Sequence, residues 1–448
     1  MIKTSRITRR RALKLGAAAT ALPLVHIRTA GAAGKLNVGP WDHWVPAGNE
    51  VLRKQMEAWA DKNKVEMRID FITSQGGKQL ITINAEAQAK TGHDMLSMAS
   101  WVPGSVSSLL EPVDDVMGRL TAKYGTTNPI FEYMGKFDGK WLALPTSWGT
   151  QNKGPAARIS TMKQAAGIDL LEMYPARDVR TELAKQWTVE AHLKAAEACA
   201  KVGMPFAIGL GTTADSVDTL GGLFAAFGAQ LVDAKGTMQI KSDAVAQALE
   251  YCVKLAKFLP ADAISFDDAS NNKALIAGRS ALIWNPPSAW AVAKRDAPAV
   301  AADTWHIPAP LGPKGRFMPF IPNYWAIWSF SQNKAAAKDL LEHLSQRDMV
   351  QERAAPVEGY DLPPFQSMTD FPIWNEVGPP KGTVYNYPVR AVHDSMEHLS
   401  GFPAPPEVGV KMYQRGTLPN MVARLMKGQP MKEVLSWAEN EVEGFMRG

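Results

Sequence analysis

Cysteine is almost absent from this sequence of 448 residues, which contains only Cys199 and Cys252. Two cysteines cannot build the disulfide framework that holds small secreted domains together, so the chain must rely on a large hydrophobic core. Both lie in helical patterns, which favours two buried thiols and leaves a single disulfide as the alternative. The eight histidines form no ligand-spaced cluster with cysteine, so the sequence predicts no metal site.

The chain also lacks an excess of charge of either sign once its first residues are set aside. The formal net charge is +5, but seven of the 49 Lys and Arg residues lie within residues 1–32, which contain no acidic residue. The remaining chain has 42 basic and 44 acidic residues, so it is slightly acidic. Such a balance gives no reason to expect a nucleic-acid partner. After residue 32 no apolar run is long enough to span a membrane.

Residues 1–32 have the order of parts that an export signal requires. Thr8-Arg9-Arg10-Arg11-Ala12-Leu13-Lys14 resembles the twin-arginine motif, with Ala12 where that motif usually has Phe. A weakly apolar segment over 15–25 follows, and Ala30-Gly31-Ala32 provides a small-x-small cleavage site. We therefore expect a twin-arginine signal peptide over 1–32, a mature chain that begins near Ala33, and a periplasmic location.

The hydrophobic pattern of the remaining chain predicts an α/β protein. Strands and helices are expected to alternate from its beginning, with strands over 35–38, 65–72 and 95–99 and helices over 49–62 and 76–89. This alternation is typical of βαβ units and a parallel sheet. After an extended segment over 141–150, helices and a short strand over 205–210 predict a second unit of similar kind.

One later stretch has the composition of a ligand-binding loop. Ala281 to Trp284 has the length of a short buried strand, which must stop at Asn285-Pro286-Pro287 because two consecutive N–H donors are missing. A helix can follow, with Ser288 or Asn285 as its cap. Ligands of open α/β sheets lie beyond the carboxyl ends of strands, so this stretch is a candidate for contact with a small polar molecule.

Seven short motifs, taken in order, resemble those of one protein family. They are Lys35-Leu-Asn-Val38, Lys90-Thr-Gly-His-Asp94, Trp141-Leu-Ala-Leu-Pro145, Ala166-Gly167-Ile-Asp169, Trp187-Thr188, Ala277-Gly-Arg-Ser-Ala281 and Asn333-Lys334-Ala335-Ala336-Ala337-Lys338. Each is weak alone. Behind an export signal and in this order, they resemble an extracellular solute-binding protein of a carbohydrate ABC importer, in the broad family that includes maltose-binding protein. The resemblance covers essentially the whole chain after residue 32.

This resemblance implies a two-lobe periplasmic binding protein fold of the α/β class. Each lobe is expected to be a mixed sheet flanked by helices, and the lobes close on the ligand by bending at a hinge. By similarity, the chain crosses between lobes near Pro145–Trp148, near Ile321–Tyr324 and after Gly359. The expected boundaries are 33–145 plus 322–360 for the N-terminal lobe and 146–321 plus 361–448 for the C-terminal lobe.

The resemblance further implies that the protein captures a carbohydrate, a sugar or a polyol, and delivers it to the membrane permease subunits of an ABC importer. Such a protein is not an enzyme, needs no cofactor and is expected to be a monomer. Two departures concern the ligand. Ser288 stands where maltose-binding protein has an aromatic residue three positions after Asn285, and Trp101 lies a few residues beyond the expected aromatic. We therefore expect a different sugar or a sugar derivative.

A sugar exposes apolar C–H faces and a ring of hydroxyl groups, so its site needs flat aromatic rings and fixed hydrogen-bonding groups. The chain has 14 Trp residues, several in loops that should follow strands. Trp59, Trp187 and Trp437 lie in helical patterns and are expected in the core. Asp215 suits a helix cap as well as a ligand contact. The candidate ligand-binding residues are Asp42, His43, Trp44, Ser100, Trp101, Trp148, Thr213, Asp215, Trp284, Asn285, Ser288, Trp290 and Tyr324.

Other functions are weighed against this one. The Gly209-Leu-Gly211 turn after an expected strand is similar to a dinucleotide fingerprint, so an exported cofactor-containing oxidoreductase is the alternative from another class. Against it, this motif lies mid-chain without a matching βαβ core upstream, and the family resemblance already explains it. Ser160-x-x-Lys163 and Lys90-Thr91-Gly92 match motifs of penicillin-binding enzymes, but in reversed order and without the third motif. A binding protein for a non-sugar solute also stays open, although the basic residues that an anion would need are spread over the chain.

Overall fold

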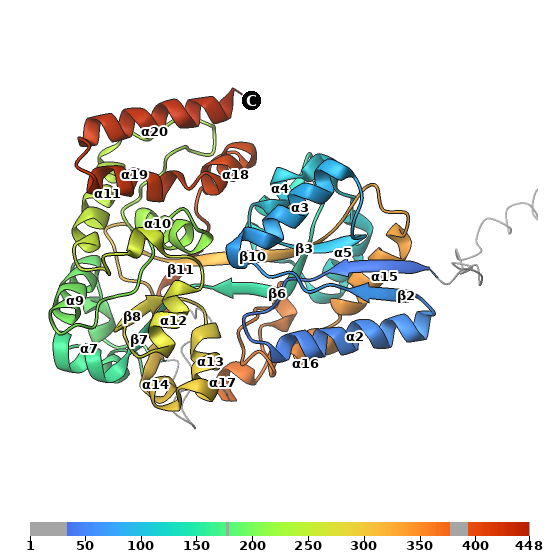
Figure 1. Ribbon diagram of the computed structural model, residues 1–448, viewed down its shortest axis with the longest axis horizontal. Coiled ribbons are helices and arrows are strands. Elements are labelled where there is room, and N and C mark those ends of the chain that lie inside the picture. The colour runs from blue at the N-terminus through green and yellow to red at the C-terminus, as the bar shows by residue number, and fades with distance from the viewer. Residues whose placement is uncertain (1–33, 176–178, 377–392, 448) are drawn as a thin grey trace, which may run out of the picture.

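The computed structural model describes residues 34–175, 179–376 and 393–447, so the expected signal peptide over 1–32 lies outside the described residues. The helices and strands form two groups, joined by two long strands that run from one group to the other (Figure 1). Each group has its own sheet and its own hydrophobic core. We call the group that contains the first strands the N-terminal lobe and the other group the C-terminal lobe.

The N-terminal lobe is built on a mixed sheet. Its strands are β1 (Lys35–Gly39), β2 (Glu66–Ile69), β3 (Met95–Ala99) and the second half of β10 (Arg316–Ile327). β1 pairs in parallel with β2 and β3, and β3 pairs antiparallel with β10. The connecting helices α2 (Ala47–Asn63) and α3 (Lys78–Ala89) supply the crossovers that parallel strands need. The strand–helix alternation predicted for this part is confirmed.

The C-terminal lobe has a smaller sheet, in which β7 (Pro155–Arg158) pairs antiparallel with β8 (Leu282–Trp284) and β9 (Thr304–His306). Its helices include α7 (Ile159–Ala166), α9 (Val189–Lys201), α10 (Ala214–Ala226), α11 (Asp243–Ala256), α12 (Ser270–Ile276), α13 (Ser288–Asp296), α18 (Pro406–Gln414), α19 (Thr417–Met426) and α20 (Met431–Met446). The prediction of a strand over 205–210 is wrong. Only an isolated parallel bridge from Phe206 to Leu282 is present, because the chain leaves the sheet and the Leu210 N–H donates to Ala263 O at 2.8 Å.

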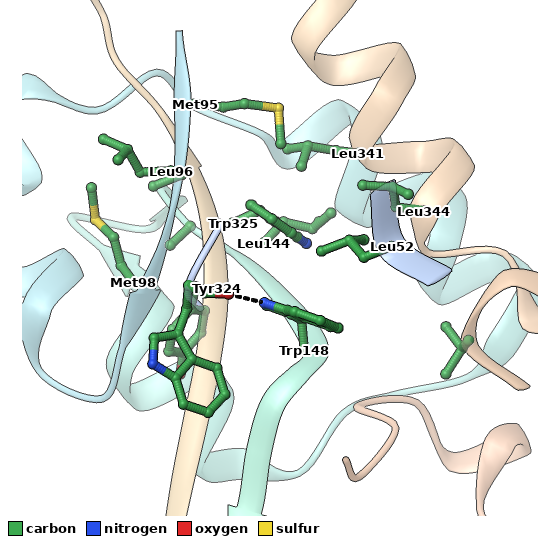
Figure 2. Close-up of a cluster of buried hydrophobic side chains, with 14 of the residues drawn as sticks. Leu52, Met95, Leu96, Met98, Leu144, Trp148, Tyr324, Trp325, Leu341 and Leu344 are labelled. Atoms are coloured by element: carbon green, nitrogen blue, oxygen red, sulfur yellow. Dashed lines mark hydrogen bonds between the residues drawn. The ribbon is translucent and has the colours of Figure 1, made fainter. Parts of the chain in front are cut away.

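Tryptophan side chains fill much of both cores. Figure 2 shows Trp148 and Trp325 packed among leucine and methionine side chains of the N-terminal lobe, with Tyr324 beside them. As expected, Trp59 and Trp187 are buried, at 5% and 0% exposure, whereas Trp437 is only half-buried against the core of the C-terminal lobe. A ring of this size buries apolar area on the order of 200 Å², so these residues are major contributors to the stability of their cores.

Cys199 on α9 and Cys252 on α11 are both free and buried in the core of the C-terminal lobe, so the expectation of two unpaired thiols is confirmed. Burial raises the pKa of the Cys199 thiol to about 11 and that of Cys252 to about 12. Both thiols therefore stay protonated near neutral pH and behave as small apolar side chains.

The two strands that join the lobes are β6 (Leu144–Asn152) and β10, which pair antiparallel with each other. Their pairing is interrupted by a register shift between Ile321 and Asn323, where Pro322 has no N–H to donate. β11 (Ser395–His398) runs parallel beside the first residues of β10. Residues 362–374 contribute to the core of the N-terminal lobe, although we expected the C-terminal lobe to resume at residue 361.

Candidate ligand-binding site

The loop that follows β1 holds its histidine inside an aromatic cluster. The His43 ring centroid lies 4.9 Å from that of Trp41 and 4.8 Å from those of Trp148 and Tyr360. His43 Nε2 lies 3.1 Å from Asp361 Oδ1. His43 is 3% exposed and Trp148 is fully buried. These two candidate ligand contacts therefore hold the loop against β6 and the segment around residue 360.

The same cluster reaches the strands that join the lobes. The Trp148 indole donates to Trp41 O at 3.0 Å, the bond drawn in Figure 2. The Gly149 N–H donates to Asp361 Oδ1 at 2.9 Å, and Asn323 Nδ2 donates to Gly149 O at 2.7 Å. Asp361 Oδ2 is buried without a partner among the described residues. The Asp361 carboxylate thus contacts both the backbone of β6 and the His43 side chain of the loop after β1.

Asp42 and Trp44, on either side of His43, are less enclosed. Both are half-buried. Asp42 accepts from Asn49 Nδ2 at 2.7 Å, and the Trp44 ring meets the Trp41 ring edge-on at 6.4 Å. Trp41 donates its indole N–H to Ser74 Oγ at 3.2 Å. This rim therefore presents one carboxylate and one indole face that the core does not fully use.

The turn after β3 sends a tryptophan toward the other lobe. Ser100 has a φ of 45°, a left-handed conformation that non-glycine residues rarely adopt, and its N–H donates to Pro322 O at 2.8 Å. Trp101 follows, is 1% exposed, and donates its indole N–H to Ser400 O at 2.9 Å. Its ring centroid lies 6.4 Å from that of Tyr413 on α18.

A buried charge cluster faces this turn from the C-terminal lobe. Lys153, 1% exposed, forms an ion pair with Asp215 and lies 4.0 Å from Asp218 Oδ2. Asn271 Nδ2 donates to Asp215 Oδ2 at 2.8 Å, and the Asp215 N–H donates to Asp268 Oδ1 at 3.0 Å. The cluster holds three carboxylates and one ammonium group, so it carries a surplus of acceptors.

The position of the cluster at a helix start has a local cause. Thr213 is the N-cap of α10 and accepts from the Ser216 N–H, so Asp215 occupies the first turn, where the helix dipole favours a carboxylate. Burial nevertheless raises the pKa of Asp215 to about 6 and that of Asp218 to about 7, against the lowering effect of Lys153. Tyr413 hydrogen-bonds to Asp218 and interacts with Ser100, which links the cluster to the N-terminal lobe.

The stretch after β8 is buried throughout. Asn285 Nδ2 donates to Ser288 Oγ at 2.9 Å, and Asn272 Nδ2 approaches the same oxygen at 3.4 Å. Neither Asn285 nor Ser288 caps α13, whose N-cap is Pro287 without a side-chain bond, so the expected cap is wrong. The Ser288 hydroxyl oxygen instead lies next to the side-chain amides of Asn285 and Asn272. Asn272 Oδ1 is buried without a partner among the described residues.

The remaining aromatic candidates point into packed regions. Trp284 is 2% exposed and its indole lies 3.5 Å from His192 Nε2, a ring whose pKa burial lowers to about 3. Trp290 is 1% exposed, with the Lys294 ammonium 4.9 Å from its ring centre. Tyr324 is fully buried and donates to Phe131 O at 3.1 Å.

The structure thus brings the sequence candidates together in two places. His43 and Trp148 meet beside the crossing strands, whereas Asp215 lies in the charge cluster and Ser100 and Trp101 bridge toward it. Several residues that contact these candidates were not predicted from the sequence, because the residues they contact lie far away along the chain. They are Asp218, Asp268, Asn271, Tyr360, Asp361, Ser400 and Tyr413. A polar pair such as Asn271-Asn272 inside a short helical pattern was the one local signal that pointed to them.

The motif of the oxidoreductase alternative has a packing explanation. A side chain at Gly209 would lie 2.9 Å from Ser216 Oγ, and one at Gly211 would lie 3.0 Å from Ile264 O. The glycines therefore allow α10 and the segment around 264 to approach closely. Within the described ranges, no group of three His, Cys, Asp or Glu side chains is arranged to hold a metal ion, and no helix is long and apolar enough to cross a membrane.

Residues 54–378 match the model of a protein family described as bacterial extracellular solute-binding protein. The chain belongs to this family. Membership implies a protein that binds a solute and works outside the cytoplasm. No curated protein sequence matches the chain.

Solved structures of the same fold cover nearly the whole of this solute-binding protein. Maltose-bound MalE3 of T. maritima is 18% identical with a TM-score of 0.70, over 92% of this chain and 99% of that one. A sugar transporter from Arthrobacter chlorophenolicus A6 with bound laminaribiose is 15% identical with a TM-score of 0.70, over 92% and 99%. An ABC transporter solute-binding protein from Agrobacterium radiobacter K84, in complex with ribitol, is 16% identical with a TM-score of 0.67, over 92% and 98%. The two-lobe periplasmic binding protein fold is thereby confirmed.

Proposed function

We propose that this protein is the substrate-binding component of an ABC importer, which holds a sugar or polyol between its lobes and delivers it to membrane permease subunits. The charge cluster around Asp215 carries this proposal. Carboxylates and a buried amide at the start of a helix accept and donate hydrogen bonds in fixed directions, which suits a ring of hydroxyl groups. The names of the similar structures, which hold maltose, laminaribiose and ribitol, support the same solute class.

The proposed site has one contribution from each lobe. Asp215, held by Asn271, binds hydroxyl groups from the C-terminal lobe, while Trp44 and Asp42 supply a stacking face and an acceptor from the N-terminal rim. His43, Trp148 and Tyr324 support the site without touching the solute, because their side chains are buried among protein groups. β6 and β10 form the hinge, and we place the third crossing after residue 374, because the N-terminal core extends to that residue.

We further propose that residues 1–32 direct twin-arginine export to the periplasm, and that the mature protein is a monomer without a cofactor or catalytic activity. The exported oxidoreductase is not favoured, since the glycines that suggested it are explained by close packing. A binding protein for an anionic solute is also less favoured. Lys153 is paired with Asp215, and Arg158 is paired with Asp303 at 2.8 Å.

The test is a thermal-shift screen of the protein from Ala33 against monosaccharides, disaccharides, oligosaccharides, polyols and sugar acids. A ligand at a hundred times its Kd stabilises the protein by about 2.7 kcal/mol, which raises the melting temperature measurably. Asp215→Asn should weaken the binding of any hit about tenfold, whereas Asp233→Asn, on an exposed turn, should leave it unchanged. A screen in which only the sugar acids bind, or in which nothing binds, contradicts the proposal.

A further inference from the structure

Trp101 fits into a socket on the opposite lobe that only glycine can form. A side chain at Gly409, inside α18, would overlap the indole, with its Cβ 2.8 Å from Cζ3. A Cβ at Gly401 would lie 3.1 Å from Cζ2. The indole N–H is satisfied by Ser400 O. The ring therefore passes from the N-terminal lobe into a slot whose two walls lack side chains.

Other contacts extend this junction. Tyr133, on α6 (Pro129–Gly135) of the N-terminal lobe, meets Trp101 edge-on at 5.6 Å and Phe402 at 5.1 Å. Its hydroxyl donates to Ala404 O. We call Trp101, Tyr133, Phe402 and Tyr413 the aromatic seam. Figure 1 shows α18 beside α4 (Val102–Ser105), on one side of the strands that join the lobes.

The opposite side of those strands is also bridged. Trp290 on α13 of the C-terminal lobe packs in the N-terminal core, and Lys294 forms an ion pair with Glu358 at 2.8 Å. Figure 1 places α13 below the crossing strands and α18 above them. The charge cluster is joined to the aromatic seam through Tyr413 and Asp218. It is joined to α13 through the neighbouring Asn271 and Asn272, whose side chains contact Asp215 and Ser288. Both bridges therefore connect to the elements that carry Asp215.

We propose that Trp101 is a specificity-determining residue, which closes one end of the cleft by entering the Gly401–Gly409 socket and limits the ligand to a monosaccharide or disaccharide. This inference rests on the proposed function. The left-handed backbone of Ser100 turns the chain out of β3, and the indole that follows contacts Ser400 and Gly409 of the C-terminal lobe. A longer saccharide would have to extend out of the cleft at this end, where the Trp101 ring blocks its path.

Three variants test this. Trp101→Ala empties the socket, and Gly409→Ala expels the ring while placing alanine in a helix, where it is favoured. Gly444→Ala on α20 is the matched control, because a Cβ there meets nothing within 4 Å. The probes are glucose, maltose, maltotriose and maltotetraose, with cellobiose and cellotetraose as a second linkage. Dissociation constants are measured by calorimetry, and the radius of gyration by small-angle scattering.

The wild type and Gly444→Ala should bind the best one- or two-ring probe at least about tenfold more tightly than the four-ring probe of its series. Trp101→Ala and Gly409→Ala should reduce that preference to about threefold or less and enlarge the radius of gyration. Equal wild-type affinity for two and four rings, or variants that keep the wild-type preference, overturns the proposal. Should no probe bind the wild type, scattering decides: an enlarged radius in both variants supports the socket, and an unchanged radius overturns it.

Discussion

Lys153 and Asp215 form an ion pair in which the ammonium group is 1% exposed and the carboxylate side chain 23% exposed. Lys153 directly follows the last residue of β6, and Asp215 lies in the first turn of α10. The pair therefore ties a hinge strand to the helix that carries the proposed sugar contacts. A movement of β6 relative to α10 would therefore also change the charge interactions of the proposed site.

Lys153→Met should be strongly destabilising, because it leaves two buried carboxyls without their cation. We expect the free energy of unfolding at neutral pH to fall by about 3 kcal/mol, measured by urea denaturation. Lys163→Met is the control, since Lys163 pairs with Asp169 at the surface and its replacement should have a much smaller effect on the free energy of unfolding. Similar losses of unfolding free energy in the two variants would show that the buried pair stabilises the protein no more than a surface pair does.

Asp218→Asn should change how stability depends on pH. Burial raises the pKa of Asp218 from 3.8 to about 7, so its contribution to stability is complete below pH 3.8 and is lost as the pH rises through about 7. Asn mimics the neutral carboxyl, so the variant should gain on the order of 2 kcal/mol relative to wild type between about pH 4 and pH 8. The measurement is urea denaturation across that range.

Asp233→Asn provides the opposite sign for comparison. Backbone N–H groups, first that of Thr237, lower the pKa of Asp233, so its contribution is present above pH 3.8 and is lost as the pH falls through the lowered value. Its removal should therefore lower stability near neutrality and not at strongly acidic pH. Parallel pH profiles for the two variants would contradict the assignment of Asp218.

Gly149→Ala should disturb the hinge more than its backbone angle alone explains. Gly149 has a φ of 82°, and a Cβ there would lie 3.0 Å from the Trp41 ring. Gly139 has a φ of 76° and open space around it, so Gly139→Ala isolates the backbone cost of about 1–2 kcal/mol. We expect Gly149→Ala to exceed this cost and to weaken sugar binding. Equal losses in the two variants, with unchanged binding, would exclude a role for the Trp41 contact.

Replacement of both Arg9 and Arg10 by lysine should block export while leaving the folded protein intact, because the twin-arginine motif requires the pair of guanidinium groups. Processing is followed by mass spectrometry of cell fractions, with a new amino terminus expected near Ala33 in the wild type. Arg28→Lys, outside the motif, is the control. Normal export of the double variant would point to a different route.

The architecture could be predicted from local patterns, whereas the direction of individual side chains could not. The strands around Val38 and Met95 and the core positions of Trp59 and Trp187 follow from hydrophobic periodicity, which is a property of neighbouring residues. Whether an aromatic ring after a strand faces the cleft or the core depends on partners that lie hundreds of residues away. Asp361 holds His43, and Ser400 holds Trp101. Seven motifs in order identified the family, but none of them encodes these pairs.

The interleaving of the two cores has a consequence for synthesis on the ribosome. The core of the N-terminal lobe draws on residues 36–148 and then on residues 320–374, while that of the C-terminal lobe needs α18, α19 and α20 from the end of the chain. Neither lobe can complete its core when only its first half has been synthesised. Early segments therefore stay without their distant partners until later segments are made. This delay slows folding and lengthens the exposure of unpaired β-strand edges. Under the proposed twin-arginine export, which carries folded proteins, the chain would therefore gain from chaperone cover until its last helix has been made.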